Sequence, residues 1–121
     1  YGDFMGLRLH LRRVRSTTSA TVSQLSIMDS VIFIVGGDSG EYDPILQLPD
    51  NCESGQVFII KGTRGSRDYS IQTYPKDTNR DKIWWATHDY TYNTGSITDA
   101  KTYTLIYDSL NHIWGMSISS Y

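Results

Sequence analysis

The residues best suited to binding in this sequence lie close together between positions 84 and 93. They are Trp84, Trp85, His88, Tyr90, Tyr92 and Asn93. Aromatic faces stack on the C–H side of sugars, and Tyr and Asn supply hydrogen bonds at low entropic cost. One interpretation is therefore a surface that binds a sugar or a protein, formed by Trp84, His88, Tyr90, Tyr92 and Asn93. The alternative is that the tryptophans belong to the core and the tyrosines pack at subunit contacts.

Two motifs that suggest a nucleophile or an ion have simpler explanations as turns. Residues 37–40 read Gly-Asp-Ser-Gly, as in the nucleophile loop of trypsin-like proteases, but Glu41 follows in place of Gly, and the motif lies in the first third of the sequence, whereas that fold needs a much longer stretch before it for the His and Asp partners. Residues 77–81 open like a calcium loop, but Lys82 stands where that loop requires Gly. We therefore interpret residues 37–40 as a turn that ends a strand, and expect no calcium at residues 77–81.

Other patterns for ion binding also lack a complete set of ligands. Asp38, Glu41 and Asp43 could share a cation, but carboxylates in loops usually face water. Residues 62–67 could hold an anion on backbone N–H groups, although a hairpin turn is favoured there. The three histidines, which lie on separate strand regions without a zinc-ligand pattern, are His10, His88 and His112. We expect no metal and no cofactor.

Catalysis has no clear basis in the acidic residues. Hydrolysis of a polysaccharide needs two carboxylates that flank the scissile bond. Asp89 and Asp108 are candidates, but nothing in the sequence brings them together. We therefore expect this protein not to be an enzyme, and a carbohydrate-active or carbohydrate-binding module remains an alternative.

The composition excludes several other classes of protein. The chain has 121 residues, enough for one domain, and a net charge of −2, which argues against a general nucleic-acid binder. A single cysteine, Cys52, leaves no disulfide framework within one chain. No apolar stretch is long enough to span a bilayer, so we expect no membrane insertion.

Residues 45–61 predict two strands joined by a turn, and the rest of the chain is organised around them. The first strand stops at Pro49, which lacks an N–H group. Gly55 can adopt a positive φ in the turn that follows. The second strand, residues 57–60, is rich in β-branched and aromatic residues. Together they predict a central hairpin.

Short extended segments at regular spacing continue along the chain. Alternating or apolar strands are predicted near residues 7–14, 31–35, 69–73, 82–92, 102–107 and 114–118, with no convincing helix. About eight short strands indicate an all-β fold, a compact antiparallel β-sandwich or a jelly-roll-like domain.

Three of these segments are apolar on both faces, namely residues 31–35, 57–60 and 83–86. A two-layer fold gives each sheet one inner face and one face toward water. A single copy would then expose a large apolar patch, with Phe58 and Ile60 among its residues, and soluble monomers rarely do so. We therefore expect a homo-oligomer.

The order of turns and strand ends resembles that of the C-terminal β-structured head modules of bacteriophage tail and head fibres. In those modules a strand ends in Leu-Pro, a polar turn holds a Gly, and an Ile-Lys strand follows. An Asp-x-Ile step comes next, and the module closes with a Thr/Leu-rich strand, an Asp turn, an Asn and a Trp. The matching residues here are Leu48-Pro49, 51–55, Ile59-Ile60-Lys61, Asp81-Lys82-Ile83, 104–108 and 111–114.

The resemblance covers about residues 7–119 and implies a homotrimeric head at the tip of a virion fibre, attached to an upstream shaft. Residues 1–15 would hold the connection to that shaft and the first strand, and residues 16–121 would form a single β-sandwich head. The implied function is attachment to a host-surface receptor, a glycan or a protein. The alternative is a structural trimerisation or capping domain that binds nothing. Trp85 departs from the pattern, because the family usually has Gly there.

Overall fold

The structure is a computed structural model that describes residues 10–15, 22–35, 42–50, 52–63, 68–73, 81–85, 89–94, 97 and 101–120. Within these residues the chain forms ten β-strands and no helix. The all-β class predicted from the sequence is therefore confirmed, with more strands than the eight we expected. None of the described elements is a helix that could cross a membrane.

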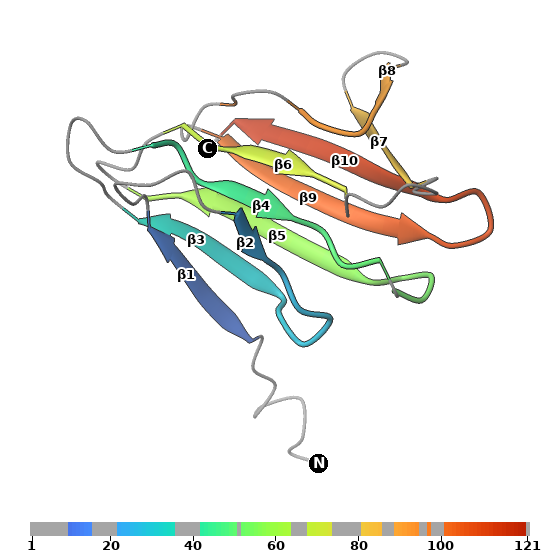
Figure 1. Cartoon of the computed structure of the whole chain (residues 1–121), viewed down its shortest axis with the longest axis horizontal. Coiled ribbons are helices and arrows are strands. Elements are labelled where there is room, and N and C mark those ends of the chain that lie inside the picture. Colours follow the sequence, from blue (N-terminus) through green and yellow to red (C-terminus); the bar gives the residue numbers. More distant parts are fainter. Residues whose placement is uncertain are drawn as a thin grey trace.

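The first six strands alternate between two sheets (Figure 1). The odd-numbered strands β1 (Leu11–Arg15), β3 (Val31–Val35) and β5 (Val57–Gly62) belong to a seven-stranded sheet. The even-numbered strands form a three-stranded sheet in the order β2 (Val22–Gln24), β4 (Ile45–Gln47) and β6 (Ser70–Gln72). The chain thus crosses from one sheet to the other after each of these strands.

This winding makes the neighbouring strands parallel. In the larger sheet Leu11 pairs with Val31 and Val31 pairs with Ile59, with all three strands running the same way. Each strand reaches its neighbour only after the chain has passed through the other sheet, so the direction is preserved. The antiparallel arrangement that we predicted is therefore wrong for the pairings among β1 to β6.

The central hairpin predicted for residues 45–61 is also wrong. Strand β4 pairs with β2 and β6, whereas β5 pairs with β3 and β9 in the other sheet. The connection from Leu48 to Gln56 is too long for a tight hairpin and leads the chain across to the larger sheet. The hairpin favoured at residues 62–67 fails for the same reason, because β5 and β6 lie in different sheets.

The last four strands complete the larger sheet, whose order is β1-β3-β5-β9-β10-β7-β8. Strands β9 (Lys101–Asp108) and β10 (Ile113–Ser120) form an antiparallel hairpin, and β7 (Lys82–Trp85) runs parallel to β10. Residues 82–92, predicted as one strand, contain β7 and the antiparallel β8 (Asp89–Thr91). This part of the sheet places β7 next to β10, although the two are distant in the sequence.

Both sheets contribute to one hydrophobic core. Ile32, Ile34 and Leu105 of the larger sheet and Leu46 and Ile71 of the smaller sheet are fully buried in the same cluster. Aromatic side chains add specific contacts. The ring centroids of Phe58 and Trp114 lie 5.5 Å apart, and Tyr69 meets Tyr103 edge to face at 6.0 Å. Such pairs add stability beyond the area that they bury.

The inner and outer faces of the larger sheet differ in how far one chain buries their apolar residues. Phe58 and Ile60 are fully buried within one chain, so the prediction that they need a second copy to cover them is wrong. Their neighbours on β5 point the other way, and Val57 is 36% exposed while Ile59 is half-buried. Five apolar residues of this face on β1, β3 and β5 lie next to one another, with Arg13 and Lys61 on the same face beside them. We call these five the apolar strip; they are Leu11, Val31, Phe33, Val35 and Ile59.

Candidate functional site

A shallow groove lies on the outer face of the larger sheet, over strands β7, β9 and β10. It holds about 370 Å³ and is lined by Trp84, Ile106, Gly115, Met116 and Ser117. This size is at the lower end of the range for small-molecule sites. The lining combines an aromatic ring, aliphatic surface and a hydroxyl group, which is a suitable set for a sugar.

The register of the sheet explains the groove. Gly115 pairs with Trp84 on one side and with Ile106 on the other. Gly115 has no side chain, so the space between its two large neighbours stays open. A Cβ atom at Gly115 would meet the carbonyl oxygen of Ile106 at 3.8 Å, an ordinary contact, so the fold itself does not demand glycine here. Glycine in a strand interior often marks a close approach by a ligand.

Trp84 is well exposed for a residue of this kind. It is 43% exposed on the outer face, whereas Trp85 points to the other side and packs partly against the core. The alternation of side chains along β7 produces this division. The two tryptophans therefore face opposite ways, and Trp84 is the one on the outer face.

A cation lies on the same face of β7 as Trp84. Lys82 precedes Trp84 by two residues on β7, so both side chains are on the same face. The Lys82 Nζ atom lies 5.5 Å from the centroid of the Tyr92 ring, which is a cation–π contact. Tyr92 is itself 49% exposed. Lys82 thus contacts Tyr92 and shares a strand face with Trp84, and both aromatic residues are candidates from the sequence.

The other candidate residues have different positions. Asn93 is exposed, but its backbone forms an isolated bridge with Gln72 of β6 and its N–H donates to the Thr91 hydroxyl at 2.8 Å. Asn93 therefore helps to lead the chain toward the smaller sheet. Tyr90 pairs with Trp84 through its backbone, and its side chain lies outside the described part of the structure. His88 lies outside the described residues altogether.

Sequence reasoning missed Gly115, Ile106, Ser117 and Lys82. The only signal for Gly115 was an isolated glycine within the apolar pattern of the last strand, which can indicate close backbone approach. Its partner Trp84 could not be identified, because a parallel pairing between distant strands leaves no local pattern.

A second cluster surrounds the buried carboxylate of Asp81. The Tyr107 hydroxyl donates to Asp81 Oδ1 at 2.8 Å, and His112 Nδ1 lies 3.5 Å from the same oxygen. Burial, together with the nearby carboxylates of Asp81 and Asp50, raises the pKa of the Cys52 thiol to about 11. A thiol with this pKa is almost fully protonated near neutral pH and is a poor nucleophile. We interpret this cluster as structural.

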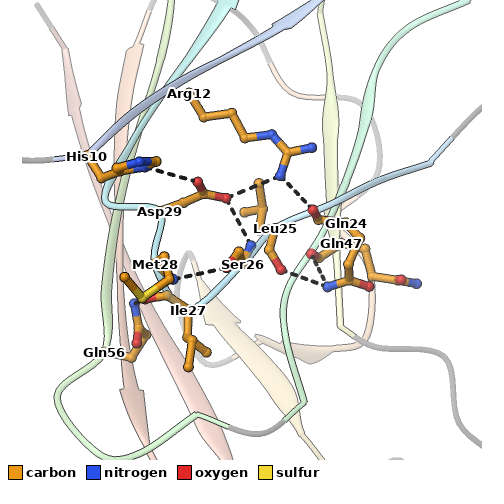
Figure 2. Close-up of polar contacts among 10 residues, drawn as sticks. All are labelled: His10, Arg12, Gln24, Leu25, Ser26, Ile27, Met28, Asp29, Gln47 and Gln56. Carbon is orange, nitrogen blue, oxygen red and sulfur yellow. Dashed lines mark hydrogen bonds and ion pairs between the residues drawn. The ribbon is translucent and has the colours of Figure 1, made fainter.

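A third cluster fixes the turn between β2 and β3. The carboxylate of Asp29 is 4% exposed and accepts hydrogen bonds from the Ser26 N–H at 2.9 Å and from Arg12 Nη1 at 3.2 Å. Figure 2 shows Arg12 and His10 pointing toward Asp29 from the β1 side, with His10 Nδ1 3.5 Å from Oδ1. Arg12 also donates to the Gln24 carbonyl at 2.7 Å. These contacts tie β1 and the end of β2 to one turn.

The patterns for ion binding that the sequence offered can be compared with the described residues. No three His, Cys, Asp or Glu side chains gather there as a metal site would require. His10 and His112 belong to different clusters, beside Asp29 and Asp81. Residues 37–40, most of the calcium-like loop at 77–81 and residues 64–67 lie outside the described part of the chain.

Comparisons with known proteins do not identify a family. Neither a scan against protein-family models nor a search of curated proteins found a match. Function must therefore be inferred from the groove and the faces of the two sheets.

Proposed function

We propose that this domain binds a saccharide in the groove beside Trp84, as the attachment head of a virion fibre. The observation that carries the proposal is an exposed tryptophan paired with a strand-interior glycine on the outer face of a sheet. A sugar ring could lie against the indole with its edge over Gly115, while Ser117 supplies a hydroxyl group. The proposed action is binding without catalysis.

The resemblance to fibre heads, carried by turns and strand ends, supports the virion setting of this proposal. In that setting the domain would act as a homotrimer of sandwich-like heads, with the apolar strip on β1, β3 and β5 covered by neighbouring copies. The groove and the strip occupy different halves of the outer face, so one need not block the other. Three linked grooves would raise the avidity of a weak site.

A structural trimerisation domain is the second candidate. The partly exposed apolar strip favours it, because Leu11 is 37% exposed and Val31, Phe33 and Val35 are half-buried in a single chain. This candidate explains the strip but gives no reason for glycine at position 115.

Binding to an array of glycans separates these two candidates. We expect the unaltered chain to bind one class of saccharide, and Trp84→Ala to weaken that binding by about tenfold, which is the loss of roughly 1.4 kcal/mol of stacking. Gly115→Val, which fills the floor of the groove, should have a similar effect. Leu110→Ala is the matched control, because Leu110 is 85% exposed in the turn after β9 and lies outside the groove.

The same experiment can refute the proposal. If the chain binds no saccharide, or if both groove variants bind as well as Leu110→Ala, the groove is not the site. A trimer without saccharide binding would favour the structural candidate.

A further inference from the structure

The charges around the groove indicate what kind of saccharide it takes. Lys82 lies two residues from Trp84 on the same face, about 7 Å along the strand. Its ammonium group lies over the ring of Tyr92, which limits the directions in which the flexible side chain can point. A ligand stacked on Trp84 would therefore have a positive charge within reach.

Among the described residues, the two carboxylates nearest to Lys82 in sequence and register accept hydrogen bonds from other groups. Asp81 is buried and accepts the Tyr107 hydroxyl at 2.8 Å. Asp108 lies two strands away from Lys82, roughly 10 Å, because both residues pair with Ile113. Its oxygens accept the Leu110 N–H at 3.0 Å and the Asn111 side-chain amide at 2.8 Å.

We propose that the groove binds an acidic saccharide, with the sugar ring on Trp84 and a carboxylate, sulfate or phosphate substituent on Lys82. This inference rests on the proposed saccharide-binding function and adds the chemical class of the ligand. The acidic group is recognised through a charge-assisted hydrogen bond, which is stronger than a neutral one. Tyr92 acts as a positioning residue, because its ring holds the ammonium group on the same face of β7 as Trp84.

The test compares matched pairs of oligosaccharides that differ only in charge. Suitable probes are a uronate oligosaccharide and its methyl ester, a sialylated glycan and its asialo form, and a sulfated glycan and its unsulfated form. We expect the acidic member of at least one pair to bind about threefold to tenfold more tightly at low salt, and this difference to shrink as salt is added.

Variants of Lys82 assign the effect to one side chain. Lys82→Gln should reduce binding of the acidic member to the level of the neutral one, and Lys82→Arg should retain the preference. Lys101→Gln makes the same change of charge five residues from Ile106 on β9, where the side chain lies on the opposite face of the strand, and it should leave the preference intact. Tyr92→Phe should keep the preference and Tyr92→Leu should reduce it, because only the former retains the ring.

The outcomes distinguish this inference from the proposed function. Equal binding of acidic and neutral members, with loss in Trp84→Ala, would overturn the acidic preference and leave saccharide binding in place. An acidic preference that survives in Lys82→Gln would overturn the role of Lys82. Absence of binding to every saccharide would remove both proposals.

Discussion

Gly115 is a residue whose contribution to stability and proposed contribution to binding have opposite signs. Glycine in a strand interior is less stable than alanine by roughly 0.5–1 kcal/mol, because it loses more backbone freedom on folding. The backbone around Gly115 leaves room for a Cβ atom. We therefore expect Gly115→Ala to raise the free energy of unfolding by about that amount in urea denaturation.

Saccharide binding by Gly115→Ala shows whether the glycine serves the groove. If the glycine is retained for the groove, Gly115→Ala should be more stable and bind less tightly. A destabilised variant would show that the backbone at position 115 needs glycine for a reason other than the groove.

The thiol of Cys52 provides a second test at the scale of one residue. Its pKa is raised from 9.0 to about 11, chiefly by burial. At about pH 8 the thiolate fraction falls from about one in ten to about one in a thousand, so alkylation by iodoacetamide should be about 100-fold slower in the folded chain than in urea. Equal rates in the two states would contradict the burial of this thiol.

The raised pKa of Cys52 also sets the sign of a pH effect on stability. The folded state holds the thiol proton more tightly than the unfolded state, so this group favours folding below pH 9.0 and the advantage is lost as the pH rises toward about 11. In Cys52→Ala this part of the decline should be absent. Urea denaturation at several pH values measures the difference between the two proteins.

At the scale of elements, the sequence predicted strands better than it predicted their partners. Pro49 follows β4 closely, and Gly55 has the positive φ of 94° expected for the turn before β5. These features depend on local chemistry, namely a missing N–H and a missing Cβ. The pairing of β4 with β2 and β6 depends on the packing of both sheets around one core, which local patterns do not encode.

The apolar pattern of β3 and β5 was identified correctly, but its inner face needs no second copy to cover it. Strands that are apolar on both faces are typical of parallel sheets, which are usually covered on both sides. Here the inner face is covered by the smaller sheet of the same chain, and only the outer face keeps exposed apolar residues such as Val57. The pattern therefore indicated parallel pairing as well as a need for cover.

The turn between β2 and β3 depends on Asp29. Asp29→Ala leaves the Ser26 N–H and Arg12 without their shared acceptor, which should lower the free energy of unfolding by about 2 kcal/mol. Asp29→Asn is the matched control, because its amide oxygen can still accept the Ser26 N–H, and it should lose less. Urea denaturation of both variants checks this order, and an unaffected Asp29→Ala would mean that the contacts in Figure 2 add little stability.

At the scale of the whole molecule, the proposed site depends on winding that brings distant segments together. Trp84 could be selected from the sequence because exposed aromatic residues are common in binding sites. The groove itself forms only where β7 lies parallel to β10, so that Trp84 and Gly115 become neighbours. The contact of Lys82 with Tyr92 has a more local origin, because β8 pairs antiparallel with β7 and places Tyr92 beside Lys82.

The apolar strip leads us to expect that copies of the chain assemble. Phe33 lies on this strip between Arg13 and Lys61 in the register, and it is half-buried in a single chain. If neighbouring copies cover the strip, the unaltered chain should have the mass of a trimer in light scattering at micromolar concentration. Phe33→Lys should then yield folded monomers, because it would bury a third positive charge beside two others in the interface. Phe33→Leu preserves the apolar surface and should remain trimeric.

A monomeric wild-type chain, with circular dichroism that shows native strands, would exclude the homotrimer. Any saccharide binding would then have to arise from a single groove.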